Sequence, residues 1–182
     1  MSDVEILLTK MFDIMDEEFS NPYIVMNKYD EVPYKLPSDL DMCITPDDFA
    51  RLDNILSKVA KGIKLSIVQK IWHGYEKCAY ILSPLEPKER FRLQLDFFTD
   101  FSVKNTPLLI SYKDMQKETR QYGRFTIPNY RMEYVFLLMR RIFKNDFDAE
   151  HLKPIQDAMN GNKTEAFAFL YKYLDRVFSY TF

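Results

Sequence analysis

The scarcity of glycine is the feature that most constrains how this chain can fold and bind ligands. Its 182 residues include only 4 glycines, Gly62, Gly74, Gly123 and Gly161, and no two of them lie near each other. Phosphate-binding loops of the Walker and dinucleotide-binding types need closely spaced glycines, so both are excluded. Glycine-punctuated sandwiches and propellers are disfavoured for the same reason. Any phosphate chemistry here must use another arrangement.

The charge and cysteine content exclude several classes of function. The 25 basic and 27 acidic residues give a net charge of −2, so nothing attracts the whole chain to nucleic acid or to an anionic membrane. Cys43 and Cys78 are isolated thiols, and His73 and His151 are far apart, which excludes a zinc or histidine-rich site. No apolar run approaches the roughly 20 residues of a membrane span, and the acidic N-terminus is unlike a signal peptide. We therefore expect a cytoplasmic protein.

Hydrophobic periodicity predicts helices and strands in mixed order. Apolar side chains recur at helical spacing near the start and in the last third of the chain, and period-two alternation marks short segments between them. The expected helices span 3–19, a segment capped by Thr45, and stretches around 132–143, 149–159 and 167–178. The expected strands span 23–26, 39–44, 63–72, 77–82 and 90–98, and 105–129 is expected to be a mixed loop.

This order of elements predicts an α+β fold. We expect a mixed β-sheet of about five strands with packed helices, followed by C-terminal helices. The core would cover residues 1–128 and the helical part 129–182, together forming one compact unit. The aromatic share of 15% fits a core packed with rings.

Three carboxylates stand apart from the solvated acidic residues. Asp39 and Asp41 are two residues apart on a predicted strand, so they project from one face, roughly 6.7 Å apart along it. Asp96 lies on the strictly alternating strand 90–98, whose opposite face is wholly apolar. If the two strands are neighbours, the three carboxylates converge. An isolated acidic pair also caps turns at loop-to-strand junctions, so the third acid strengthens the signal.

Convergent carboxylates repel one another unless a cation lies among them. Hard oxygen ligands suit Mg²⁺ or Mn²⁺. Two such ions about 3.5–4 Å apart can hold an attacking oxygen and a triphosphate for in-line displacement. Asp39 and Asp41 would bind both ions. Asp96 would complete the inner ion's coordination and help to deprotonate an acceptor hydroxyl.

These residues resemble the nucleotidyltransferase superfamily, which has the DNA-polymerase-β-like fold. Its pattern is a strand ending in Gly-Ser, a loop, an acid-x-acid motif on the next strand, and a third acid two strands later. The matching segments here are Tyr23–Lys28, Ser38–Ile44 and Leu93–Phe98, within a resemblance over about residues 20–145. The stretch 23–33 before the acidic pair is similar to bacterial nucleotidyltransferase-like domains, some encoded near surface-polysaccharide genes or fused to kinase-like domains.

The resemblance implies a metal-dependent enzyme that moves a nucleotidyl group from an NTP to an acceptor, with Asp39, Asp41 and Asp96 as metal-binding and catalytic residues. The residues implied to bind the nucleotide are Asn27, Lys28, Ser38 and Arg92. The chain departs from the family pattern where Gly-Ser should cradle the triphosphate, because Asn27-Lys28 stands there. Lys28 could hold a phosphate as a point charge, or be a solvated loop lysine in an inactive domain.

Two further pairs of residues have alternative interpretations. Arg92 and Gln94 share the predicted face of Asp96, where they could touch a nucleotide or only order the acids. Trp72-His73 lies at an expected hairpin tip, where it could stack on a base, or Trp72 could be a half-buried residue beside the turn.

Four functions stay open at this level. The first is a Mg²⁺-dependent nucleotidyltransferase with an unknown acceptor. The second, suggested by the missing Gly-Ser, is a degenerate binding or partner domain. The third is a toxin–antitoxin component that modifies RNA or protein. A glycosyltransferase ranks last, because only one helix and one short strand precede the acidic pair.

Overall fold

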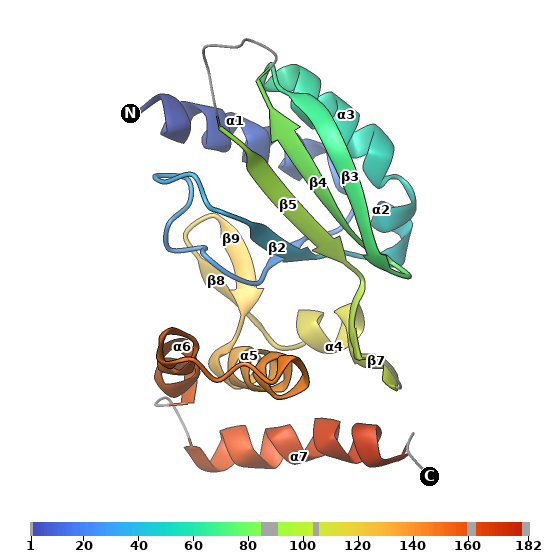
Figure 1. Cartoon of the computed structure of the whole chain (residues 1–182), viewed down its shortest axis with the longest axis vertical. Helices are drawn as coiled ribbons and strands as arrows, with labels where there is room; N and C mark the ends of the chain where they lie inside the picture. Colours follow the sequence, from blue (N-terminus) through green and yellow to red (C-terminus); the bar gives the residue numbers. More distant parts are fainter. Residues whose placement is uncertain (1, 85–90, 104–105, 160–162, 180–182) are drawn as a thin grey trace. The chain divides into compact units, whose positions relative to one another are not determined.

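The computed structural model describes residues 2–84, 91–103, 106–159 and 163–179 (Figure 1). By its internal contacts the chain divides into two compact units, Met1–Thr99 and Asp100–Phe182. The division falls between Thr99 and Asp100. The sequence instead predicted a boundary between residues 128 and 129, directly before the C-terminal helices. The α+β class is confirmed, since both units combine helices with strands.

The first unit is built on a mixed sheet. Its elements are α1 (Asp3–Glu18), β1 (Ile24–Val25), β2 (Leu40–Cys43), α2 (Pro46–Ala50), α3 (Leu52–Gly62), β3 (Ser66–Gly74), β4 (Lys77–Ser83) and β5 (Leu93–Phe98). The strands of this unit lie in the order β3-β4-β5-β2-β1. The pair β2–β5 is parallel, and the other pairs are antiparallel. These are the five strands that the sequence predicted.

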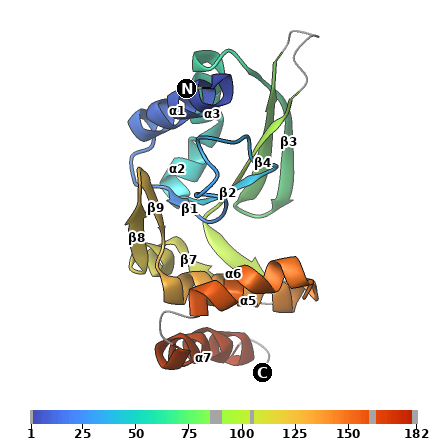
Figure 2. The ribbon, with the colours of Figure 1, turned by 90° about the vertical axis from the view of Figure 1, so that its left-hand side faces the viewer.

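Helices α1 and α3 cover one side of this sheet (Figure 2). Both helices bury one apolar face, as their periodicity predicts, and α1 begins with a capping box formed by Ser2 and Glu5. Phe97 of β5 is fully buried, and its ring stacks on that of Phe19 at the end of α1 with centroids 6.2 Å apart. The apolar face of β5 therefore packs in the core, and its other face carries polar side chains.

The helix predicted after Thr45 is interrupted. Thr45 caps α2 as expected, accepting a hydrogen bond from the backbone N–H of Asp48 at 3.1 Å. However, Arg51 leaves the helical conformation, with φ −101° and ψ 2°, and α3 begins after it. The Arg51 guanidinium donates to the buried Asp48 carboxylate at 2.7 Å and to the Ser20 hydroxyl at 2.8 Å. The bond to Ser20 joins residues 31 apart in the chain, so periodicity does not reveal it, and it accompanies the break.

The second unit contains two hairpins and four helices among its described residues. Its elements are β6 (Asp100–Val103), β7 (Thr106–Ser111), α4 (Tyr112–Gln116), β8 (Thr119–Tyr122), β9 (Phe125–Pro128), α5 (Tyr130–Lys144), α6 (Ala149–Met159) and α7 (Lys163–Ser179). The expected C-terminal helices are confirmed. The expected loop over 105–129 is wrong, because β7, α4, β8 and β9 occupy it. These elements have only four to six residues each, too few for periodicity to show.

An ion pair joins the last helix to the start of this unit. Arg176 of α7 donates to the Asp114 carboxylate of α4 at 2.7 Å and to the Leu109 carbonyl of β7 at 2.9 Å. The contact fixes α7 against elements more than 60 residues earlier. Across the described helices of both units, none has the length and apolar character needed to cross a membrane.

Candidate active site

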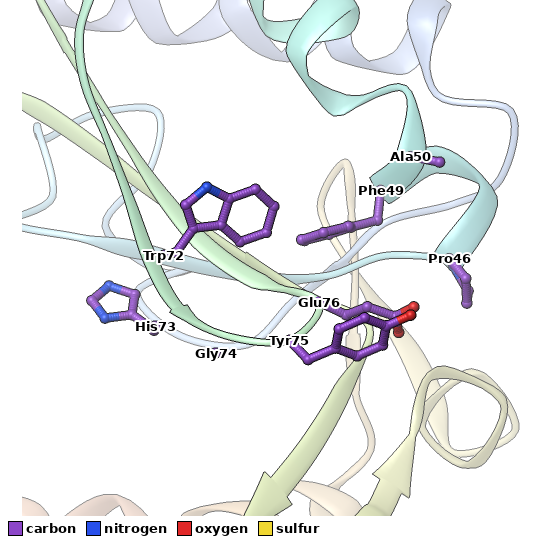
Figure 3. Close-up of a pocket in the computed structure, with 8 residues that line it drawn as sticks. All are labelled: Pro46, Phe49, Ala50, Trp72, His73, Gly74, Tyr75 and Glu76. Carbon is purple, nitrogen blue, oxygen red and sulfur yellow. The ribbon is translucent and has the colours of Figure 1, made fainter.

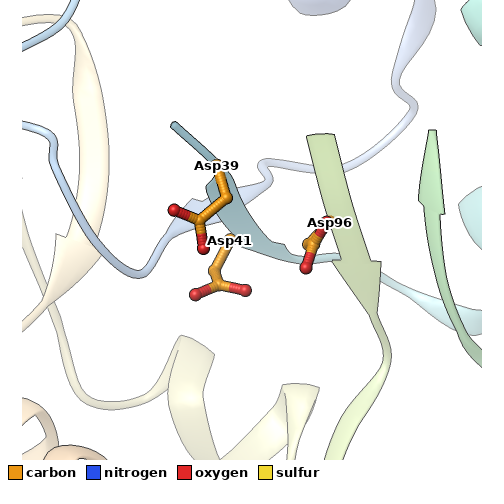
Figure 4. Close-up of side chains that lie close together, drawn as sticks. All are labelled: Asp39, Asp41 and Asp96. Atoms are coloured by element: carbon orange, nitrogen blue, oxygen red, sulfur yellow. The ribbon is translucent and has the colours of Figure 1, made fainter. Parts of the chain in front are cut away.

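Three carboxylates converge on the first unit's sheet (Figure 4). Asp39 directly precedes β2, Asp41 lies within it, and Asp96 lies on β5. Because β2 and β5 pair in parallel, Asp41 stands directly opposite Asp96. One carboxylate oxygen from each of the three lies within 4.8 Å of the others. The convergence expected from the two alternating strands is observed, and the roles of these residues stay a prediction.

The alternation of buried and polar side chains fixes this geometry. Leu93, Leu95 and Phe97 of β5 are fully buried, so the intervening Gln94 and Asp96 must point to the other face.

Burial differs among the three acids. Asp41 is only 4% exposed, whereas Asp39 and Asp96 are partly open to solvent. The cluster therefore has one interior carboxylate and two that an incoming ligand can reach.

Asn27 holds the interior carboxylate. Its side-chain N–H donates to Asp41 Oδ2 at 2.8 Å, and its Oδ1 accepts from the Asp41 backbone N–H at 2.9 Å. Both ends of the Asn27 amide are thus bonded to one residue. A buried carboxylate needs such partners to be tolerated. In the place where the family resemblance expects glycine, the structure has a residue that orients Asp41.

Lys28 contacts the outer carboxylate. Its Nζ donates to Asp39 Oδ1 at 2.8 Å and also to the Ser38 hydroxyl, which itself donates to Asp39 Oδ1 at 2.7 Å. The backbone of Lys28 is left-handed, with φ +52°. Only glycine adopts this region without steric cost. The chain therefore keeps a glycine-like turn here but carries an ammonium group on it.

The pKa of Asp96 is shifted from that of an ordinary aspartate. Burial raises its pKa above the usual value, and the negative charges of Asp41 and Asp39 raise it further. A hydrogen bond from Gln94 Nε2 at 2.9 Å and the charge of His73 act in the opposite direction without cancelling the shift. Gln94 thus orders the acid, one of the two roles considered for it. Asp96 binds a proton more readily than an ordinary aspartate does.

If a divalent cation binds this cluster, it is expected to dissociate at a higher pH on acidification than a cation bound by carboxylates of ordinary pKa. A proton on Asp96 competes with a cation, and its raised pKa moves this competition toward neutral pH. The measurement is the Mn²⁺ dissociation constant from mildly acidic to neutral pH by calorimetry. Asp96→Asn should bind more weakly at neutral pH with a flatter profile. An equally steep profile in that variant would contradict the assignment.

A second feature of this unit is an open hollow of about 740 Å³ (Figure 3). It lies between the start of α2 and the β3–β4 turn, and its lining residues are Pro46, Phe49, Ala50, Trp72, His73, Gly74, Tyr75 and Glu76. Trp72 is 59% exposed, more than the half-buried alternative implied. Its ring meets Phe49 edge-on at 6.1 Å, and Lys70 Nζ lies 4.5 Å from its centroid. His73 both lines the hollow and acts electrostatically on Asp96.

The structure gathers most of the expected site residues but not all of them. Asn27, Lys28 and Ser38 adjoin the acidic cluster through the hydrogen bonds above. Arg92 precedes β5 and its side chain is exposed. Within the described ranges, no hydrogen bond or ion pair links Arg92 to the carboxylates.

Comparison with known proteins adds little beyond this geometry. No protein-family profile matches the chain, and no curated protein matches it significantly. Among solved structures, it is similar to a "putative nucleotidyltransferase from H. pylori", with 13% identity and a TM-score of 0.46 over 97% of this chain and 84% of that one. It is also similar to JHP933 from Helicobacter pylori, with 13% identity and a TM-score of 0.43 over 97% and 82%. Likeness at this level assigns no function to the chain.

Proposed function

We propose that this chain is a metal-dependent nucleotidyltransferase that moves a nucleotidyl group from an NTP to an acceptor. The acceptor oxygen bonds to the α-phosphorus, and pyrophosphate leaves. The observation that carries the proposal is the Asp39, Asp41 and Asp96 cluster. Its oxygens come from neighbouring parallel strands and lie within 4.8 Å of one another. The proposed acceptor is a hydroxyl or phosphate group.

The donor set fits a hard divalent cation. All three groups offer carboxylate oxygens, the ligands that Mg²⁺ and Mn²⁺ prefer. Burial raises the pKa of Asp96, and the negative charges of Asp41 and Asp39 raise it further; a cation would relieve that repulsion. When bound, such an ion supplies charge neutralisation and polarisation of the phosphoryl oxygens.

The remaining steps belong to the chain's own residues. Asn27 holds Asp41 in one orientation, so this ligand needs no reorganisation during binding. Gln94 donates a hydrogen bond to Asp96 Oδ1. We propose that the other oxygen, Oδ2, takes the acceptor's proton. Lys28 and Ser38 lie at the outer carboxylate, toward which we propose that the triphosphate approaches.

A non-catalytic nucleotide-binding or partner domain is the second candidate. Its specific support is the Lys28 ammonium on Asp39, since an internal cation can neutralise a carboxylate that no longer binds metal. This candidate predicts a folded chain with no turnover.

The deciding experiment combines binding with transfer. Each NTP is titrated into the protein with Mg²⁺ or with EDTA, and α-³²P-labelled NTPs are then incubated with it and fractionated cell extract. Metal-dependent binding with label transfer supports the enzyme, and binding without transfer supports the partner domain. Absence of both would exclude the enzyme and leave the cluster without a nucleotide role. Asp41→Asn should lose the metal-dependent signal. Asp47→Asn, on the exposed side of α2, is its matched control.

A further inference from the structure

The strongest observation outside the carboxylates themselves is the position of the Lys28 ammonium. It lies 2.8 Å from Asp39 Oδ1, the same carboxylate that the proposed metal site needs. Asp39 also accepts from the Ser38 hydroxyl, so two donors meet on one of its oxygens. In the described structure, the Lys28 ammonium already neutralises part of the cluster's negative charge.

The Lys28 contact differs in kind from the Asn27 contact beside it. Asn27 binds the buried Asp41 through two hydrogen bonds, one of them to the backbone. Lys28 and Asp39 meet at the surface, with side chains 29% and 32% exposed. Partly exposed ion pairs contribute little stability, because water solvates both partners once they separate. The Lys28–Asp39 pair is therefore the exchangeable contact of the cluster, and the Asn27–Asp41 pair is the fixed one.

Lysine suits an exchange of partners. Its ammonium is a compact charge with rotatable donors on a flexible stem, and it binds carboxylate or phosphate without a fixed geometry. A divalent cation on Asp39 would repel the ammonium, whereas a triphosphate brought in by that cation would attract it. The divalent cation and the triphosphate would thus both favour movement of the Lys28 ammonium away from Asp39.

We propose that Lys28 is an exchangeable counter-ion: it occupies Asp39 in the free protein, is displaced by the divalent metal, and then pairs with the triphosphate. The proposal rests on the function proposed above and assigns Lys28 a triphosphate-binding role within it. It makes binding ordered, since the ammonium becomes free for the nucleotide only when the cation has taken its place. It also predicts opposite effects of one substitution on two ligands.

The test is calorimetry with two probes, Mn²⁺ alone and the Mn²⁺ complex of inorganic tripolyphosphate. Lys28→Met keeps the unbranched stem and the left-handed backbone cost but removes the charge. It should bind Mn²⁺ about fivefold more tightly than the wild type and the tripolyphosphate complex about fivefold more weakly. Lys28→Arg should restore tripolyphosphate binding. The control Lys35→Met removes a lysine from the same loop, 72% exposed and paired with Glu31, and should change neither affinity.

Each outcome decides the proposal. Equal or weaker Mn²⁺ binding by Lys28→Met would overturn displacement, and unchanged tripolyphosphate binding would overturn the pairing with phosphate. If the wild type binds Mn²⁺ and Asp41→Asn does not, the proposed function stands whichever of these two results is obtained. Failure of the wild type and of Lys28→Met alike to bind Mn²⁺ would overturn both.

Discussion

Replacing Asp41 with asparagine is expected to lower Mn²⁺ affinity by at least about a hundredfold and to abolish nucleotidyl transfer. Asp41 is the interior acid of the cluster and stands directly opposite Asp96. Asn27, which follows the neighbouring strand β1, fixes the position of Asp41 through two hydrogen bonds. Asparagine has nearly the same size, and its carbonyl can still accept from Asn27, so the fold should persist.

The matched control for this substitution is Asp47→Asn. It removes the same charge from an exposed site on α2, and both affinity and melting temperature should match those of the wild type. Asp41→Asn should also lower the pKa of Asp96 toward its ordinary value, because one of the charges that raise it is gone. Retention of Mn²⁺ affinity within about twofold, less than loss of a ligand's supporting contact costs, would show that the cluster is not the metal site.

Replacing Asp48 with alanine is expected to reduce the free energy of unfolding by about 3 kcal/mol. Asp48 is fully buried and accepts hydrogen bonds from the backbone N–H groups of Ser20 and Asn21, from the Asn21 side-chain amide, from the Thr45 hydroxyl and from Arg51. Alanine would leave all five donors without this acceptor. For a chain of this length the melting temperature should fall by roughly 10 °C.

Urea and thermal unfolding would measure this effect. Asp48→Asn, which keeps one acceptor oxygen, should fall between the wild type and Asp48→Ala, and Asp47→Ala on the exposed side of α2 should change little. A loss below about 1 kcal/mol in Asp48→Ala, the value of one ordinary hydrogen bond, would contradict the role assigned to Asp48.

The same residue gives the chain an acid-sensitive contribution to stability. Burial tends to raise the pKa of Asp48, but the hydrogen bonds from Ser20, Arg51, Thr45 and Asn21 outweigh it and lower the pKa below 3.8. A lowered carboxyl pKa contributes stability that is fully present above the unfolded value. It is lost as pH falls through the folded value. Asp48→Asn should therefore lack this part of the acid unfolding.

The carboxylate cluster could be predicted because amphipathic strands carry their geometry in the sequence. On β5 every second residue is apolar, and this alone assigns Asp96 to the polar face. The sequence pattern does not show that β2 and β5 are neighbours. The structure shows that they pair in parallel and that Asp41 lies opposite Asp96. Local pattern thus located the acids, but the neighbour relation came from the tertiary fold.

The contacts of Asn27 and Lys28 could not be predicted in the same way. They depend on the antiparallel register of β1 and β2, which sets Val25 opposite Met42 and brings the residues after β1 back toward Asp41. Both strands are too short for periodicity to specify that register. The left-handed backbone of Lys28 was equally hidden, because a lysine in a sequence gives no sign of positive φ.

The parallel pairing of β2 with β5 has a thermodynamic consequence. The segment from α2 to β4 separates Asp41 from Asp96 along the chain, so the unfolded chain presents scattered acids in place of a site. A ligand that binds only the native state raises stability by mass action, about 1.4 kcal/mol for each tenfold excess over its dissociation constant. Melting temperature can therefore rank cations and nucleotides on this chain before any acceptor is known.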